Sequence, residues 1–173
     1  MNFNTPYSRD ISFFLYLLTC TDKQELIELD QKEDVVLLNT DYIITSYHIL
    51  LGVNRAYYNS AYQKTKSKIM KKEIIHCLTG ESKLENSLNM HDVKKEFNEN
   101  GNYFILFINW NKDECEKVIK GIKGNVISPG NYARFVNDDK IIKCFNITDN
   151  EINSCENGIV GAVYNRISTK DLK

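Results

Sequence analysis

The segment Tyr103-Phe104-Ile105-Leu106-Phe107-Ile108 constrains the fold more than any other part of the sequence. Its aromatic and β-branched residues have the length of a strand and leave no polar face for solvent. A strand of this kind is buried on both faces, so we expect it at the centre of a sheet. Further strands are predicted at residues 11–18 and 35–38, with a short one at 126–127 that Ser128-Pro129-Gly130 ends.

Segments with helical spacing of apolar residues alternate with these strands. Helices are predicted from Asp22 or Thr21 to about residue 29, from Ser46 to about 63, over about 69–78, from Ser82, over about 113–122, over 138–145 and from Thr148 to about 169. Ser82 and Thr148 each begin an S/T-x-x-E capping box. The order of elements predicts one domain over residues 1–173, an α/β (α+β) sandwich with a mixed, mainly antiparallel sheet and a long C-terminal helix.

Two of the predicted helices have one clearly apolar face each. We expect the faces to pack inward through Ile49, Val53, Ala56 and Ser60 in the first helix and through Met70, Ile74 and Leu78 in the second. The opposite face of the first helix carries Asn54, Arg55 and Tyr58.

The charge balance limits the kinds of partner that the chain can bind. Among 173 residues, 22 are Lys or Arg and 23 are Asp or Glu, giving a net charge of −1. This balance excludes a generic polycation, so any contact with nucleic acid has to come from a local patch. No apolar run approaches the roughly 18 residues that a membrane span requires, so no membrane partner is expected.

The sequence contains few residues arranged for catalysis. It lacks the phosphate-loop, dinucleotide, zinc-protease and hydrolase motifs. The five cysteines, at 20, 77, 115, 144 and 155, are widely spaced and are expected to be reduced core residues rather than disulfide or zinc ligands. His48, His76 and His91 are expected to be surface or capping residues. No catalytic residue, metal ligand or cofactor is predicted, although a small enzyme that uses Cys77 or a histidine stays an alternative.

Five lysines between positions 64 and 72 form the densest charge cluster. Like charges this close repel one another, and a bound polyanion would relieve the repulsion. Together with Lys83 they are the candidate tRNA-binding residues: Lys64, Lys66, Lys68, Lys71, Lys72 and Lys83. Tyr57, Tyr58 and Tyr62 lie just upstream and can either stack on unpaired bases or belong to the core. A solvated, non-binding loop is the competing interpretation of the lysines.

The predicted terminal helix carries apolar residues over about half of its circumference, from Ile152 and Cys155 to Ile167. This width implies a second buried face, provided either by the domain itself or by a partner protein. Gly158 and Gly161 would fit a close approach of another backbone. The candidate partner-binding residues are Ile159, Val163, Arg166 and Ile167.

Several strings, in the same order, resemble the PRPK-binding protein (TPRKB) family. They are Leu37-Leu38-Asn39, His48-Ile49-Leu50-Leu51-Gly52-Val53-Asn54-Arg55-Ala56, Lys66-Ser67-Lys68, Glu73-Ile74-Ile75, Leu78-Thr79, residues 84–88 and Arg166-Ile167-Ser168-Thr169-Lys170-Asp171. The resemblance covers nearly the whole chain, in outline only over 11–34 and 112–142. Lys66-Ser67-Lys68 departs from the family's K-T-R, which removes a bidentate phosphate contact, and Glu81 adds an acid to a loop that is often polar or basic.

The resemblance implies a non-enzymatic subunit of the EKC/KEOPS complex, which makes threonylcarbamoyladenosine in tRNA. Such a subunit binds and stimulates the PRPK-type kinase/ATPase, contacts other KEOPS subunits indirectly, helps to hold tRNA through its 3′ end, and is expected in cytoplasm and nucleus. Because of the two departures, tRNA binding is expected to be weak outside the complex. An adaptor that binds the kinase without RNA is the alternative within the same resemblance.

Overall fold

The computed structural model describes residues 2–3, 7, 10–20, 22–127 and 129–170. Its sheet contains β1 (Asn2–Phe3), β2 (Phe13–Cys20), β3 (Val35–Asn39), β4 (Asn102–Ile108) and β5 (Gly124–Ile127), in the order β1-β2-β4-β3. β5 pairs with residues 17–20 of β2, on the edge that β1 occupies at residues 13 and 14. The strand predicted at the centre, β4, pairs with both β2 and β3.

Every pairing between the described strands is antiparallel. The expectation of a mixed sheet was therefore wrong in this respect. β2 and β3 do run in the same direction, but β4 is inserted between them in the opposite direction, so they are not neighbours. The single-domain α+β fold is confirmed.

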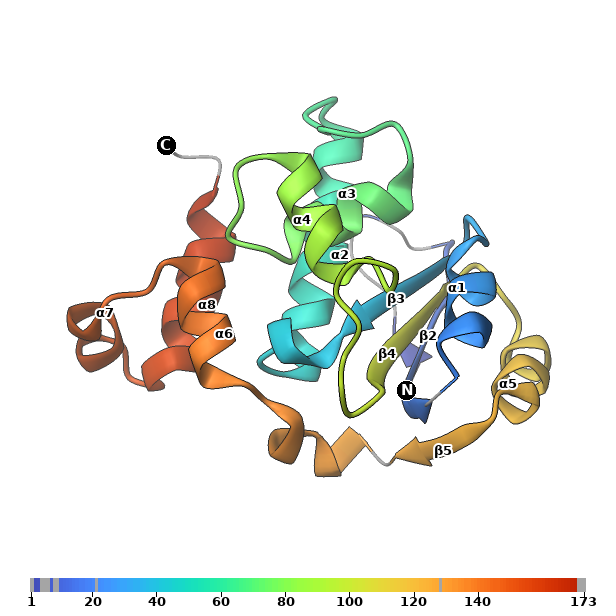
Figure 1. Cartoon of the computed structure of the whole chain (residues 1–173). Coiled ribbons are helices and arrows are strands. Elements are labelled where there is room, and N and C mark those ends of the chain that lie inside the picture. The colour runs from blue at the N-terminus through green and yellow to red at the C-terminus, as the bar shows by residue number, and fades with distance from the viewer. Residues whose placement is uncertain (1, 4–6, 8–9, 21, 128, 171–173) are drawn as a thin grey trace.

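Side chains of the central strands alternate between two cores, as the twofold period of a strand requires. Phe104, Leu106 and Ile108 of β4 enter one hydrophobic cluster, and Tyr103, Ile105 and Phe107 enter the other. Helices cover both faces (Figure 1). α2 (Ser46–Ala61) and α3 (Met70–Cys77) close the first cluster, whereas α1 (Lys23–Asp30) and α5 (Lys112–Gly121) close the second.

A third cluster lies outside this sandwich. It joins α6 (Asp138–Phe145) and α8 (Gly158–Thr169) to α2, and α7 (Asp149–Ser154) packs on α8. α4 (Leu84–His91) contacts α3 and β3, and two short 3₁₀ helices lie at η1 (Thr40–Tyr42) and η2 (Pro129–Phe135). No helix in the described part of the chain is long and apolar enough to span a membrane.

The helix starts agree with the sequence at some positions and not at others. Asp22 caps α1 and the Thr148–Glu151 capping box precedes α7, as predicted. Thr45 caps α2 in place of Ser46. The capping box predicted at Ser82 does not form. α4 begins at Leu84, so the N-cap is Lys83 instead of Ser82, and the Lys83 side chain makes no capping hydrogen bond. Thr21 and Ser128 lie outside the described residues.

The inward faces of the two amphipathic helices are largely as predicted. Ile49, Val53 and Ala56 are buried, as are Ile74 and Leu78. Ser60 is exposed, however, and the polar Asn59 is buried in its place. The core face turns toward Asn59 because its amide bonds to a buried carboxylate on α3.

The long C-terminal helix predicted from Thr148 to residue 169 is two helices. α7 ends at Ser154, because its C-cap Cys155 is extended (φ −92°, ψ 132°). Gly158, the first residue of α8, has a left-handed φ of +55°, and its N–H donates to the carbonyl of Cys155. The chain reverses there, and α7 folds back on α8. Ile152 and Cys155, which the sequence assigned to the terminal helix, therefore belong to α7 and the turn. The nearest atoms to a Cβ placed at Gly158 or Gly161 are side-chain atoms of Ile152, Cys155 and Asn157, so the expected close approach of another backbone is not what surrounds these glycines.

Candidate functional site

The loop that carries the lysines begins at a defined C-terminal stop of α2. Gln63 adopts a left-handed φ of 55°, its N–H donates to the carbonyl of Ser60, and the N–H of Lys64 donates to the carbonyl of Asn59 over 2.8 Å. These two bonds are those of a Schellman motif, which satisfies the last free carbonyls of a helix. The position of Lys64 is therefore set by backbone hydrogen bonds.

The buried carboxylate of Glu73 holds the next part of this loop. Its Oε2 accepts the backbone N–H groups of Lys66, over 2.8 Å, and of Ser67, over 3.0 Å. Its Oε1 accepts the side-chain amide of Asn59 over 3.0 Å. Glu73 has no exposed surface, so this acid fixes the loop backbone from below instead of neutralising the lysine ammonium groups above it.

The structure divides the six candidate lysines among different surroundings. Lys64 and Lys66 are exposed and line one groove together. Lys71 is mostly buried and pairs with Asp30, with 2.6 Å between Nζ and Oδ1. It borders a separate hollow of about 350 Å³ with Lys72. Lys68 and Lys83 are exposed and line neither of these two hollows.

The groove that receives Lys64 and Lys66 has a volume of about 810 Å³ and is predominantly basic. We call it the basic groove. Lys143 from α6, Arg166 from α8 and Lys170 after α8 complete its set of cations, against one acid, Glu81. Its floor includes His76, Cys144 and Phe145. Lys143 and Lys170 were not among the candidate site residues, because they are distant from the lysine cluster along the chain.

Arg166, predicted as a partner-binding residue, thus lies beside the predicted tRNA-binding lysines. Its Nη2 donates to the carbonyl of Asn146 over 3.0 Å, and it pairs with Glu151 at 2.8 Å. Hydrogen bonds from the Thr148 backbone and then from Arg166 lower the pKa of the Glu151 carboxyl. The Nε of Arg166 is buried and has no acceptor among the described residues.

Lys170 closes the end of the basic groove. Its ammonium donates to the carbonyl of Thr79 over 3.0 Å and also to the carbonyl of His76. These two acceptors are neutral carbonyl oxygens. The groove therefore combines fixed loop cations with cations anchored on the terminal helices.

The other candidate partner-binding residues lie on α8 with different exposure. Val163 is 0% exposed and Ile167 3% exposed, and both belong to the third hydrophobic cluster. Their side chains are occupied by the protein's own core because α8 packs against α2 and α6. Ile159 is only partly buried. Within this helix, contact with a partner is thus limited to side chains such as Ile159 that keep exposed surface.

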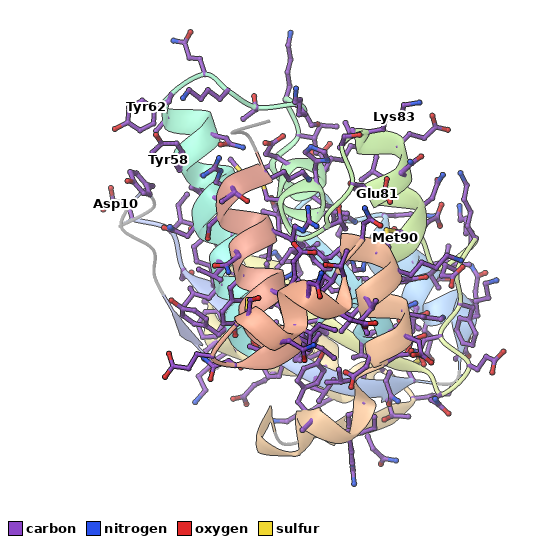
Figure 2. All side chains as sticks on the ribbon, turned by 90° about the vertical axis from the view of Figure 1, so that its left-hand side faces the viewer. Asp10, Tyr58, Tyr62, Glu81, Lys83 and Met90 are labelled. Carbon is purple, nitrogen blue, oxygen red and sulfur yellow. The ribbon has the colours of Figure 1, made fainter. Side chains whose placement is uncertain are left out.

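The tyrosines after the middle of α2 separate into core and surface residues. Tyr57 is buried against Phe13, with ring centroids 5.5 Å apart. Tyr58 is half-buried, and Tyr62 is 56% exposed. Figure 2 shows Tyr58 and Tyr62 on one side of the terminal helices and Lys83, beside Glu81, on the other.

The histidines and cysteines are mostly structural. All three histidines are buried, which corrects the expectation of surface positions. Burial lowers the pKa of His48 to about 4, and its ring accepts the N–H of Ile44 and donates to the carbonyl of Leu78. All five cysteines are free, and only Cys155 has appreciable exposure. Cys77 is buried beside the carboxylate of Glu73, which opposes formation of a nucleophilic thiolate.

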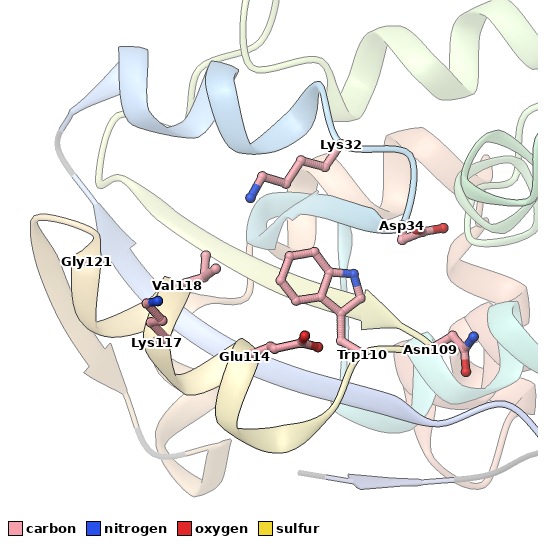
Figure 3. A pocket seen from close by; sticks show the side chains of 8 residues that line it. All are labelled: Lys32, Asp34, Asn109, Trp110, Glu114, Lys117, Val118 and Gly121. Atoms are coloured by element: carbon pink, nitrogen blue, oxygen red, sulfur yellow. The ribbon is translucent and has the colours of Figure 1, made fainter.

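A further hollow of about 580 Å³ lies around Trp110, next to α5 (Figure 3). The ammonium of Lys32 lies over the indole ring, 5.2 Å from its centroid, and Asp34, Glu114 and Lys117 add charges of both signs. None of the residues predicted from the sequence to bind a partner or tRNA lines this hollow.

Similarity to known proteins is found at the level of a family profile. No curated protein matches the sequence. The family profile "Kinase binding protein CGI-121" matches residues 19–171, which is nearly the whole chain and includes every element from β3 to α8. The profile thus spans both the lysine loop and the terminal helices that form the basic groove. The chain belongs to the CGI-121 family of kinase binding proteins.

Proposed function

We propose that this protein is a non-catalytic subunit of the KEOPS complex that binds the PRPK-type kinase and presents the basic groove to tRNA. The observation that carries the tRNA part is the convergence of Lys64 and Lys66 with Lys143, Arg166 and Lys170 in one groove. The kinase part rests on membership of a kinase binding family. Other KEOPS subunits are contacted indirectly, and the protein acts in cytoplasm and nucleus.

The basic groove suits the single-stranded end of a tRNA better than a duplex. Its cations come from a loop and from two helices around a concave floor that contains Phe145, so a flexible strand can enter it. Lysines contact phosphates as point charges and do not read base sequence. The groove therefore supplies affinity for the backbone of the 3′ end, while the kinase and the other subunits position the modification.

The tRNA part is tested by charge reversal. Lys64→Glu and Lys66→Glu each place an acid in the basic groove, and we expect tRNA affinity of the purified chain to fall several-fold or more. Lys112→Glu, an exposed position on α5 that covers the opposite face of the sheet, is the matched control. Equal affinity for the groove variants and the control would contradict the tRNA assignment.

The kinase part is tested by co-purification. Ile159→Glu places a charge on the part of α8 that keeps exposed surface, and we expect reduced recovery of the kinase. Ser168→Glu adds the same charge at an exposed position of the same helix and serves as the control. Unchanged kinase binding by a folded Ile159→Glu protein would show that the kinase does not bind at this part of α8. Val163→Glu is unsuitable, because this side chain is fully buried.

An adaptor that binds the kinase without RNA is the second candidate. Its support is that Lys71, one of the six lysines, is used in an internal ion pair. The same tRNA titration separates the two candidates, since an adaptor without RNA binding would show no salt-dependent tRNA affinity.

A further inference from the structure

The half-buried Tyr58 and the exposed Tyr62 form a continuous aromatic surface at the end of α2. The rings of Tyr58 and Tyr62 lie one helical turn apart, with centroids 4.6 Å from each other and planes tilted by 38°. The rings of Tyr7 and Tyr58 meet edge to face with centroids 5.2 Å apart, and the guanidinium of Arg55 lies 5.5 Å from the Tyr58 ring centroid. Tyr62 is the outermost ring. With one face toward Tyr58 and more than half of its surface exposed, it has aromatic surface open to a ligand.

This surface continues directly into the lysine loop. The Schellman stop at Gln63 brings Lys64, two residues after Tyr62, into the basic groove. Lys66 and Lys68 follow on the same loop and are exposed. Figure 2 shows Asp10 near Tyr58 in this view. Glu73, the acid that contacts the loop, is buried and accepts backbone N–H groups. The exposed charges of the loop that follows the rings are therefore those of its lysines.

We propose that Tyr58 and Tyr62 form a stacking platform for unpaired nucleobases, whose flanking phosphates Lys64 and Lys66 hold. Every base has a π-face, so stacking on tyrosine requires no particular base, and lysines beside the rings attract the phosphates between stacked bases. The inference rests on the proposed tRNA function and adds to it a second, uncharged component of binding.

The same rings could serve a protein partner, because exposed tyrosines and arginines are frequent at protein interfaces. The positive charge of the adjoining loop favours the polyanion. The two kinds of contact respond differently to salt. A phosphate contact weakens as salt rises because it depends on release of counterions, whereas a stacking contact does not depend on that release.

The experiment measures the affinity of a labelled tRNA transcript for the full chain at several salt concentrations. Tyr62→Ala is expected to weaken binding by about 5- to 150-fold, the range for loss of one stacked base, without changing the slope of log K against log salt. Tyr62→Phe should keep wild-type affinity, because the ring and not the hydroxyl makes the contact. Lys64→Ala should instead flatten the slope by about 0.7.

Two controls separate stacking from general damage. Tyr47→Ala removes another exposed tyrosine of α2, 51% exposed at the opposite end of the helix, and should leave tRNA affinity unchanged. Inorganic polyphosphate carries charge without bases, so Tyr62→Ala should bind it as wild type does.

Each alternative outcome is distinct. Wild-type tRNA affinity in Tyr62→Ala, with weakened Lys64→Ala, would overturn the platform and leave the proposed function standing. Absence of salt-dependent tRNA binding by the wild type would overturn both. Loss of kinase recovery in Tyr62→Ala at unchanged tRNA affinity would show that the rings form a protein interface and would overturn the platform as well.

Discussion

At the scale of single residues, Glu73 has the largest influence on the candidate site. A buried carboxylate is costly unless it is fully hydrogen-bonded, and Glu73 meets this condition through Asn59, Lys66 and Ser67. The Cys77 thiol also contacts this carboxylate, so two of its four donors are backbone groups of the lysine loop. The same interaction therefore stabilises the fold and fixes the cations of the basic groove.

Glu73→Ala is expected to lower the free energy of unfolding by about 3 kcal/mol, because the buried donors lose a charged acceptor. We also expect weaker tRNA binding, since the loop backbone is no longer held. Urea denaturation measures the first effect and a tRNA titration the second. Glu85→Ala, an exposed acid of α4, is the control, and a similar small effect for both variants would contradict the role given to Glu73.

Two buried histidines make stability depend on pH. Burial lowers the pKa of His48 to about 4 and that of His91 to about 3, against about 6.5 in the unfolded chain. Below pH 6.5 the unfolded chain therefore binds more protons than the folded protein, and the free energy of unfolding should fall between pH 6.5 and 4 by up to about 1.4 kcal/mol per pH unit for each histidine. Denaturation midpoints between pH 7 and 4.5 measure this decline.

His48→Gln supplies the comparison for the pH experiment. It removes one titrating group, so its stability should decline less steeply than that of the wild type over the same range, whatever its stability at pH 7. A stability that is flat from pH 7 to 5 in the wild type would show that these histidines are not held neutral by burial.

At the scale of elements, hydrophobic periodicity located the strands and helices because burial determines both. β4 and the inward residues of α2 and α3 follow directly from apolar spacing. The break between α7 and α8 did not follow, because the apolar pattern continues in phase across the turn at Cys155 and Asn157. The backbone conformation shows the break, through the extended Cys155 after α7 and the left-handed φ of Gly158 at the start of α8. Neither conformation can be read from the apolar pattern.

Gly158→Ala is expected to destabilise the protein by about 1 kcal/mol, because an L-residue is strained at a φ of +55°. Gly121→Ala is the matched control. Gly121 is the last residue of α5, a Cβ there meets no atom within 4 Å, and alanine favours the helix. The control should be neutral or stabilising by up to about 1 kcal/mol. Thermal or urea unfolding of both variants measures the difference, and equal stability would contradict the turn at Gly158.

At the scale of the whole molecule, the basic groove depends on the packing of the third hydrophobic cluster against α2. That packing brings Arg166 and Lys170 to the loop of Lys64 and Lys66. The lysine cluster was visible in the sequence as a local density of positive charge. The sequence did not show which of these lysines line the basic groove and which lie elsewhere. Lys71 faces Asp30, a residue 41 positions away, and Lys143 joins the groove from α6. Contacts of this kind follow from tertiary packing rather than from local spacing.

The net charge of the chain is nearly zero, but the charged residues are unevenly distributed over its surface. The basic groove is lined by five cations and one acid, whereas the hollow around Trp110 carries charges of both signs. Electrostatic attraction of a polyanion is therefore local and is expected to be weak for the isolated subunit. A kinase bound beside the groove would add to it by holding the tRNA in place.

The salt dependence of tRNA affinity tests the central claim most directly, measured on the full chain bound to its kinase, with the kinase alone as reference. We expect a single-stranded end to contact about three groove cations. The slope of log K against log salt should then be more negative by about 2 for the kinase with the subunit than for the kinase alone. Replacing Lys64, Lys66 and Lys143 together by alanine should abolish this increment while kinase binding is kept. A slope that the subunit does not change, or an increment that survives in the triple variant, would contradict the account.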